Sequence, residues 1–135
     1  MFVLVVGMGM MLTAIGCKPK RPGERPVFPV QGRVTYKGEP MPFAVVTFFP
    51  PNEPFAQSLK SRATADKNGY YHLTTYEQGD GAPEGEYAVV LYVPLSEPDP
   101  YELEVPNPPD RLKHAYLNPA RSKLRYAVKP EKNTI

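Results

Sequence analysis

The chain has 135 residues, of which 41% are hydrophobic and 22% charged, and its formal net charge at pH 7 is +2. This length suits one domain with one core, and the small net charge gives no support for nucleic-acid binding. The single cysteine excludes a disulfide within the chain, and the 18 prolines predict short strands joined by stiff loops, because proline breaks helices and central strands.

An apolar segment without charged residues, 1–16, opens the chain and ends in the small residues that precede Cys17. A membrane-spanning helix needs about 20 residues, so this segment is short for one. The ending resembles the lipobox of bacterial lipoprotein signal peptides, although Ala14 stands where the family prefers leucine. The resemblance implies cleavage before Cys17 and acylation of its thiol with fatty acids such as palmitate. The alternatives are an uncleaved anchor and a free core cysteine.

Residues 18–26 are basic and rich in proline, which predicts an extended tether between Cys17 and the domain. Each basic side chain near an anionic membrane contributes up to about 1 kcal/mol of binding. In lipoproteins of two-membrane envelopes, an aspartate after the cysteine directs retention in the inner membrane. Lys18 in that position implies, by the same resemblance, the outer membrane.

The first strand is predicted over 27–36, where apolar residues alternate with polar ones, and a turn follows at 37–40. The second strand, 44–49, is apolar on both faces, and a polar loop, 52–60, follows it. The third and fourth strands are predicted over 61–65 and 70–76.

Between the third and fourth strands, Asp66, Asn68 and Gly69 form a turn signal that indicates a hairpin with a bulge at Gly69. Asp66 and Asn68 also offer oxygen atoms to a calcium ion, but the further carboxylates of a calcium loop are missing. We therefore favour a structural turn.

A glycine-rich loop, formed by Gly79, Asp80, Gly81 and Gly85, precedes the fifth strand. It lacks the Lys and the following helix of a phosphate-binding loop. The fifth strand, 85–93, is apolar on both faces, which predicts a central strand covered on both sides.

Residues 94–109 contain six prolines and several acids, and we expect a long loop with a short edge strand at 101–105. This loop is the best candidate for a contact surface. One helical turn is expected around 114–117. The last strand, 123–129, should point Leu124, Tyr126 and Val128 inward, and 130–135 should form a tail.

Charge is divided along the chain. Residues 68–110 hold nine acids and no Lys or Arg, whereas 111–132 hold seven basic residues and one acid. We favour solvated surfaces for both segments, since exposed charges are the norm. A basic patch for anionic lipid or nucleic acid is the alternative.

The motifs taken together resemble a known family. V-x-G-x-V-x-Y-x-G at 30–38, E-P-M-P-F-A-x-V-x-F at 39–48 and T-A-D-K-N-G-Y-Y-x-L-x-T at 64–75 resemble a carboxypeptidase regulatory-like domain. G-D-G-A-P-E-G-E-Y-x-V at 79–89 is similar to a variant in small lipoproteins with a transthyretin-like fold. The resemblance implies an all-β, seven-stranded Greek-key β-sandwich over 27–129, in a non-catalytic, envelope-anchored protein.

Catalysis and sugar binding are the competing functions. Transthyretin-like hydrolases end in Tyr-Arg-Gly-Ser, which this chain lacks, and neither His72 nor His114 has a nucleophile beside it in the sequence. Two distant histidines also make a weak zinc site. Sugars could stack on Tyr70, Tyr76, Tyr92 and Tyr101, although packing in the core is the commoner role of strand tyrosines.

We therefore predict no cofactor, no metal and no nucleic acid. The expected partners are a membrane, through Cys17, and an envelope protein or polysaccharide.

Overall fold

The computed structural model describes residues 21–54, 57–104 and 106–135. Over these residues the protein is all-β and contains no helix, as the sequence predicts. The strands are β1 (Val27–Phe28), β2 (Val30–Arg33), β3 (Thr35–Tyr36), β4 (Glu39–Pro40), β5 (Val45–Phe49), β6 (Ser61–Thr64), β7 (Tyr70–His72), β8 (Ala82–Pro83), β9 (Gly85–Tyr92), β10 (Arg125–Val128) and β11 (Asn133–Thr134). Residues 1–16 and Cys17 lie outside the described part.

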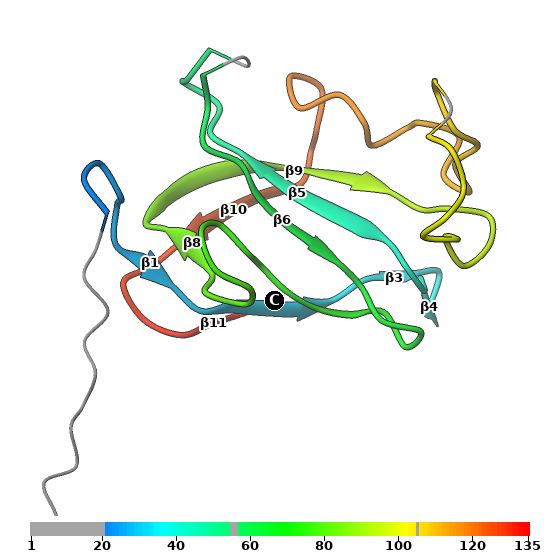
Figure 1. The fold of residues 1–135 in the computed structure, drawn as a ribbon, viewed down its shortest axis with the longest axis horizontal. Coiled ribbons are helices and arrows are strands. Elements are labelled where there is room, and N and C mark those ends of the chain that lie inside the picture. Colours follow the sequence, from blue (N-terminus) through cyan, green and yellow to red (C-terminus); the bar gives the residue numbers. More distant parts are fainter. Residues whose placement is uncertain (1–20, 55–56, 105) are drawn as a thin grey trace, which may run out of the picture.

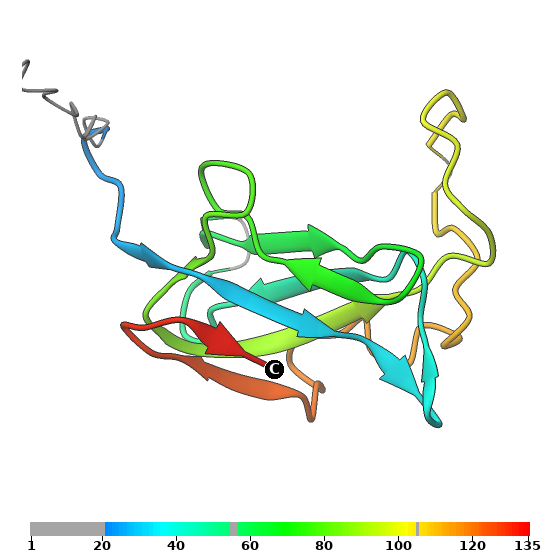
Figure 2. The ribbon, with the colours of Figure 1, turned by 90° about the horizontal axis from the view of Figure 1, so that it is seen from below.

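Most strands belong to two sheets (Figure 1). The larger sheet has the order β10-β9-β5-β6 and is antiparallel throughout. The smaller has the order β11-β2-β7, with β11 parallel to β2. Two short pairs, β1-β8 and β3-β4, extend the arrangement at opposite ends of β2 (Figure 2).

Both larger sheets contribute to one core. Val46 and Phe48 from β5 are 1% exposed, and they belong to the same buried cluster as Val30 from β2 and Tyr71 from β7. The Phe48 ring contacts the rings of Tyr87 and Tyr126, at centroid distances of 5.5 and 6.2 Å. Each fully buried side chain of this size contributes about 1.5–3 kcal/mol, so this cluster holds the two sheets together.

Strand β9 is central and covered on both faces, which confirms the prediction. It pairs with β5 on one side and β10 on the other. Tyr87 and Val89 point into the core, and Ala88 and Val90 on the opposite face are also buried.

Two predicted strands are interrupted. Pro29 separates β1 from β2, since proline has no N–H for a sheet hydrogen bond. The predicted fourth strand, 70–76, ends at His72, because Thr74 leaves the smaller sheet and pairs with Arg62 beside the larger one.

The hairpin prediction is confirmed only in part: the Asp66 N–H donates to the Tyr70 carbonyl, and Arg62 forms an antiparallel bridge with Thr74. The turn at Asp66–Gly69 joins β6 to β7, but β6 pairs with β5 whereas β7 pairs with β2. The turn therefore carries the chain from one sheet to the other.

Two other expectations are wrong. Residues 101–104 form no strand, because no neighbouring strand offers a partner. Residues 111–116 form consecutive turns and no helix. Lys113 and His114 have φ of 52° and 60°, values that a right-handed helix excludes. At the C-terminal end, the segment expected as a tail supplies β11.

A close approach fixes the position of Tyr71. Gly32 and Tyr71 are partners across β2 and β7, and an added Cβ at Gly32 would lie 2.6 Å from the Tyr71 hydroxyl oxygen. Only glycine leaves room for the ring to lie across β2. The ring is 5% exposed, and its burial, with a smaller effect from Tyr126, raises the pKa of Tyr71 from 10.0 to about 12.

Gly81 lies directly before β8 and packs against the backbone of β1. Its N–H donates to the Leu73 carbonyl, and its φ is +104°. A Cβ at Gly81 would overlap the carbonyl of Phe28, whereas one at Gly79, with a φ of +72°, would meet open space.

These two glycines form a matched pair for a stability test. We expect Gly79→Ala to lower the free energy of unfolding by about 1 kcal/mol, through backbone strain alone. Gly81→Ala should lower it by at least about 3 kcal/mol, since overlap with the β1 backbone adds to the strain. Urea unfolding measures both values, and equal losses would contradict the close packing at Gly81.

The buried phenol of Tyr71 predicts a pH dependence of stability. The folded protein holds the phenol proton more tightly than the unfolded chain does. This stabilisation is therefore complete below about pH 10 and is lost as the pH rises towards about 12. Across that range, wild type should lose on the order of 2–3 kcal/mol more than Tyr71→Phe. Urea unfolding across this pH range tests it, and parallel pH profiles of the two proteins would refute it.

Candidate functional site

The most distinct surface feature is the loop between β9 and β10. Its residues 94–104, which we call the projecting loop, extend away from the sheets (Figures 1 and 2). In both views they lie at one end of the molecule, and the first described residues, 21–26, lie at the other.

The projecting loop exposes large apolar side chains among acids. Leu95, Tyr101 and Leu103 are 57%, 92% and 86% exposed. The acids of the loop are also exposed, and no basic residue interrupts them: Glu97, Asp99, Glu102 and Glu104. Asp99 shapes the tip, because its Oδ1 accepts the N–H of Tyr101 at 2.8 Å and its carbonyl accepts the N–H of Glu102 at 3.1 Å.

The buried carboxylate of Asp110 holds the base of the loop. Its Oδ1 accepts the N–H of Val93 and of Leu112, and its Oδ2 accepts the N–H of His114, all at 3.0 Å. The N–H of Arg111 donates to the Val93 carbonyl at 2.8 Å. One side chain thus fixes the end of β9 to the turns that follow the loop.

Further contacts reinforce this base. The Tyr92 hydroxyl donates to the Pro109 carbonyl at 3.2 Å, and a guanidinium nitrogen of Arg111 donates to the Leu95 carbonyl at 3.2 Å. A ring nitrogen of His114 lies 3.0 Å from the Pro108 carbonyl. His114 therefore has a structural contact at the base of the projecting loop.

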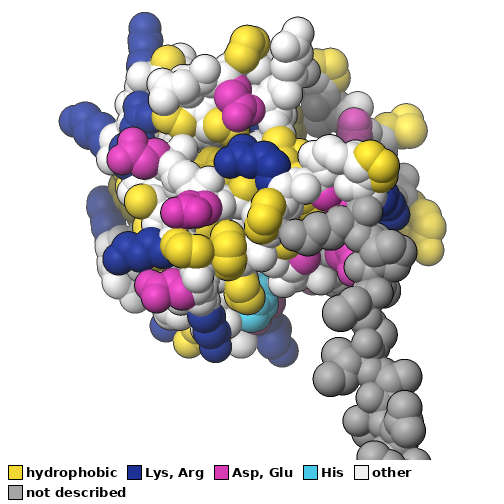
Figure 3. All heavy atoms as spheres, turned by 90° about the vertical axis from the view of Figure 1, so that its left-hand side faces the viewer, with side chains coloured by type: hydrophobic (Ala, Val, Ile, Leu, Met, Phe, Trp, Pro, Cys, Tyr) yellow, Lys and Arg dark blue, Asp and Glu magenta, His cyan; other side chains and the backbone are white. Residues whose placement is uncertain are grey.

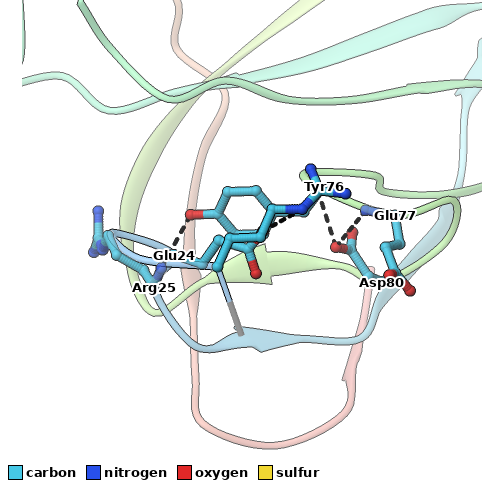
Figure 4. A network of polar contacts seen from close by, with 6 residues as sticks. Glu24, Arg25, Tyr76, Glu77 and Asp80 are labelled. Atoms are coloured by element: carbon cyan, nitrogen blue, oxygen red, sulfur yellow. Dashed lines mark hydrogen bonds and ion pairs between the residues drawn. The ribbon is translucent and has the colours of Figure 1, made fainter. Parts of the chain in front are cut away.

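A second carboxylate organises the glycine-rich loop (Figure 4). Asp80 Oδ1 accepts the N–H of Thr75, and its Oδ2 accepts those of Tyr76 and Glu77. The Tyr76 hydroxyl accepts the backbone N–H of Arg25 at 3.0 Å. This loop therefore fastens the end of the predicted tether to the domain. Gly85, with a φ of 145°, begins β9 beyond it.

The remaining predicted turn residues also have structural contacts. Asp66 Oδ1 accepts the N–H of Asn68 at 2.8 Å and of Tyr70 at 3.0 Å, and the Gly69 N–H donates to the Asp66 carbonyl. Within the described residues, no group of three or more His, Cys, Asp or Glu side chains is arranged to hold a metal ion.

The four candidate tyrosines do not form a shared platform. Tyr70 lies under the Arg33 guanidinium, at 4.9 Å, while Tyr76 and Tyr92 have the loop contacts given above. Tyr101 is on the projecting loop. His72 is exposed on β7, as predicted.

Charges of both signs mix on the end of the molecule that carries β1 and β8 (Figure 3). Arg25 pairs with Glu53 there at 3.8 Å. The concentrated negative charge of the projecting loop lies at the opposite end.

No family model, curated protein or solved structure matches the chain. The described residues contain no helix, and so none that could cross a membrane.

Sequence reasoning missed Asp110. The available signal was an aspartate directly after Pro108 and Pro109 and before a turn, where its side chain can accept backbone N–H groups. What the sequence does not reveal is that Val93, 17 positions earlier, is one of the donors.

Removing this carboxylate should loosen the loop. We expect Asp110→Ala to cost about 2–4 kcal/mol of unfolding free energy, because buried N–H groups lose a charged acceptor. The control Asp99→Ala, at the exposed tip, should cost less than about 1 kcal/mol. Hydrogen exchange should show lost protection of the Val93 and Leu112 amides in Asp110→Ala only. Unchanged protection would contradict the role of Asp110.

Proposed function

We propose that this protein is a membrane-anchored envelope lipoprotein that acts as a non-catalytic protein-interaction module. We propose the projecting loop as its contact surface. The main support is that Leu95, Tyr101 and Leu103 are exposed there among acidic side chains. Exposed apolar side chains grouped on a protruding loop mark an interaction surface more often than a surface without function.

The chemistry of the loop suggests the nature of the partner. Tyr101 offers a large aromatic side chain, the type that contributes most at protein interfaces. The four surrounding acids attract a basic surface and speed association with it. They also repel anionic lipid headgroups, so we assign the loop to a protein partner with a basic, partly apolar groove.

The place where the described chain begins supports this role. A lipid on Cys17 would hold the molecule by the end at which Arg25 is hydrogen-bonded to Tyr76 and to the Glu84 carbonyl. The projecting loop lies at the opposite end (Figure 2). Anchored in this way, the domain would present the loop away from the membrane.

The strand order supports a finer fold proposal. The two larger sheets contain seven strands, in the orders β6-β5-β9-β10 and β7-β2-β11. Strands β1 and β3 lie directly before and after β2 in the chain and continue it. We propose that this is a Greek-key β-sandwich of the transthyretin type.

The non-catalytic assignment rests on the placement of the histidines. His72 is exposed on β7, while His114 lies in the turns after Asp110 with its ring at the Pro108 carbonyl. Neither has a described Ser, Cys or Asp side chain hydrogen-bonded to its ring, which a nucleophilic mechanism requires.

Affinity co-purification from the native envelope tests the proposal. A tagged wild type should recover a defined protein, and the double variant Tyr101→Ala/Leu103→Ala should recover at least about tenfold less, since two central contacts are lost. Tyr70→Ala, which removes a 52% exposed tyrosine elsewhere, should recover the wild-type amount. Cys17→Ala should leave the membrane fraction.

Three outcomes would count against this function. Equal recovery by the loop variant would remove the loop as the contact surface. Polysaccharide recovered by both wild type and Cys17→Ala would favour a carbohydrate-binding module. Native protein found in the cytosol would refute the lipoprotein assignment.

A further inference from the structure

A cavity of about 390 Å³ lies between the two larger sheets, on the side where β10 and the residues after β11 form the edges. Its volume falls within the range of small-molecule sites, which is about 300–1,000 Å³. The inner walls are apolar and come from both sheets and from the turns after Asp110: Met41, Val46, Phe48, Val89, Leu91 and Leu112.

Two tyrosine hydroxyls border this apolar space. Tyr71 and Tyr126 both line the cavity, and neither hydroxyl has a hydrogen-bond partner among the described residues. Within the described residues no buried side-chain N or O atom lacks a partner, so both hydroxyl oxygens keep accessible surface. By contrast, the hydroxyl of the buried Tyr87 donates to the Pro83 carbonyl at 2.8 Å. The cavity thus contains hydrogen-bonding groups that no described residue uses and that remain available to a bound molecule.

The Tyr71 hydroxyl is suited to donate a hydrogen bond. Burial and the neighbouring Tyr126 raise the pKa of Tyr71 to about 12. At neutral pH its phenol therefore keeps its proton and can donate it to an acceptor on a bound molecule.

The charged side chains that line the cavity are all basic. Its lining includes Arg33, Lys123 and Arg125 and no acidic side chain. Arg33 is engaged elsewhere, since it donates to the Asn68 carbonyl and covers the Tyr70 ring. Lys123 and Arg125 are exposed at the entrance, and neither forms an ion pair with a described residue. They create a positive potential at the mouth of an apolar cavity.

We propose that this cavity binds a small amphipathic carboxylate, in the chemical class of the medium-chain fatty acids. The alkyl chain lies among the apolar walls, and the carboxylate accepts hydrogen bonds from Tyr71 and Tyr126 near Lys123. This site is separate from the projecting loop and goes beyond the proposed interaction role.

Binding of labelled decanoate to the full chain in liposomes tests the site, with empty liposomes as background. Wild type should bind one decanoate per chain saturably. Tyr71→Phe and Tyr126→Phe should each weaken binding about tenfold or more, because each removes a hydrogen bond to a charged group without changing the cavity volume. Tyr70→Phe is the matched control on the outer face of β7, and its binding should equal that of wild type.

Two further variants separate the parts of the site. Leu124→Trp should block the entrance and abolish binding. Lys123→Gln should weaken decanoate but not neutral decanol, whereas Lys129→Gln, beyond the end of β10, should change neither. Urea unfolding at neutral pH verifies that each variant folds.

The proposal is overturned if wild type shows no saturable binding, or if folded Tyr71→Phe, Tyr126→Phe and Leu124→Trp all bind as wild type does. Equal wild-type affinity for decanol and decanoate would overturn the preference for an anion.

Discussion

The burial of β9 on both faces is the constraint on which the other features depend. Its inner side chains, Tyr87 and Val89, join the core, while its backbone pairs with β10 over residues 85–88 and with β5 over residues 88–92. A slip by one residue would replace Tyr87 and Val89 in the core by Ala88 and Val90, and the smaller Ala88 could not fill the space of Tyr87. The projecting loop therefore leaves from a defined point, and one wall of the cavity, at Val89 and Leu91, is equally fixed.

Outside the sheets, aspartate carboxylates fix the turns and loops by accepting hydrogen bonds from backbone N–H groups. Asp66, Asp80 and Asp110 each accept two or three backbone N–H groups from neighbouring turns. Backbone N–H groups in turns and loops have no partner in a sheet, and a carboxylate can accept several of them at once. These carboxylate hydrogen bonds explain how a domain with short strands keeps the long loops between them in a fixed conformation.

Residue patterns predicted the elements that carry many alternating side chains. The all-β class, the central position of β9 and the inward side of Val128 follow from local alternation. Leu124, which was also expected inward, precedes β10 and is 37% exposed. Strand β11 was missed because two residues contain no period to read, and 101–104 were misassigned because alternation cannot reveal that a partner strand is absent. The cavity could not be foreseen, since Tyr71 and Tyr126 come from different sheets and their hydroxyls meet the same space only after the sheets pack.

The cavity and the projecting loop share part of their framework. Leu112 lines the cavity, and its N–H donates to the Asp110 carboxylate, which also accepts the N–H of Val93 at the start of the loop. A shift of the backbone at Leu112 must therefore change a hydrogen bond of the carboxylate that fixes the loop. Coupling between distant surfaces travels through contacts of this kind, provided that the shared element has two arrangements. The residues after Asp110 are the segment where such a change would act on both surfaces at once.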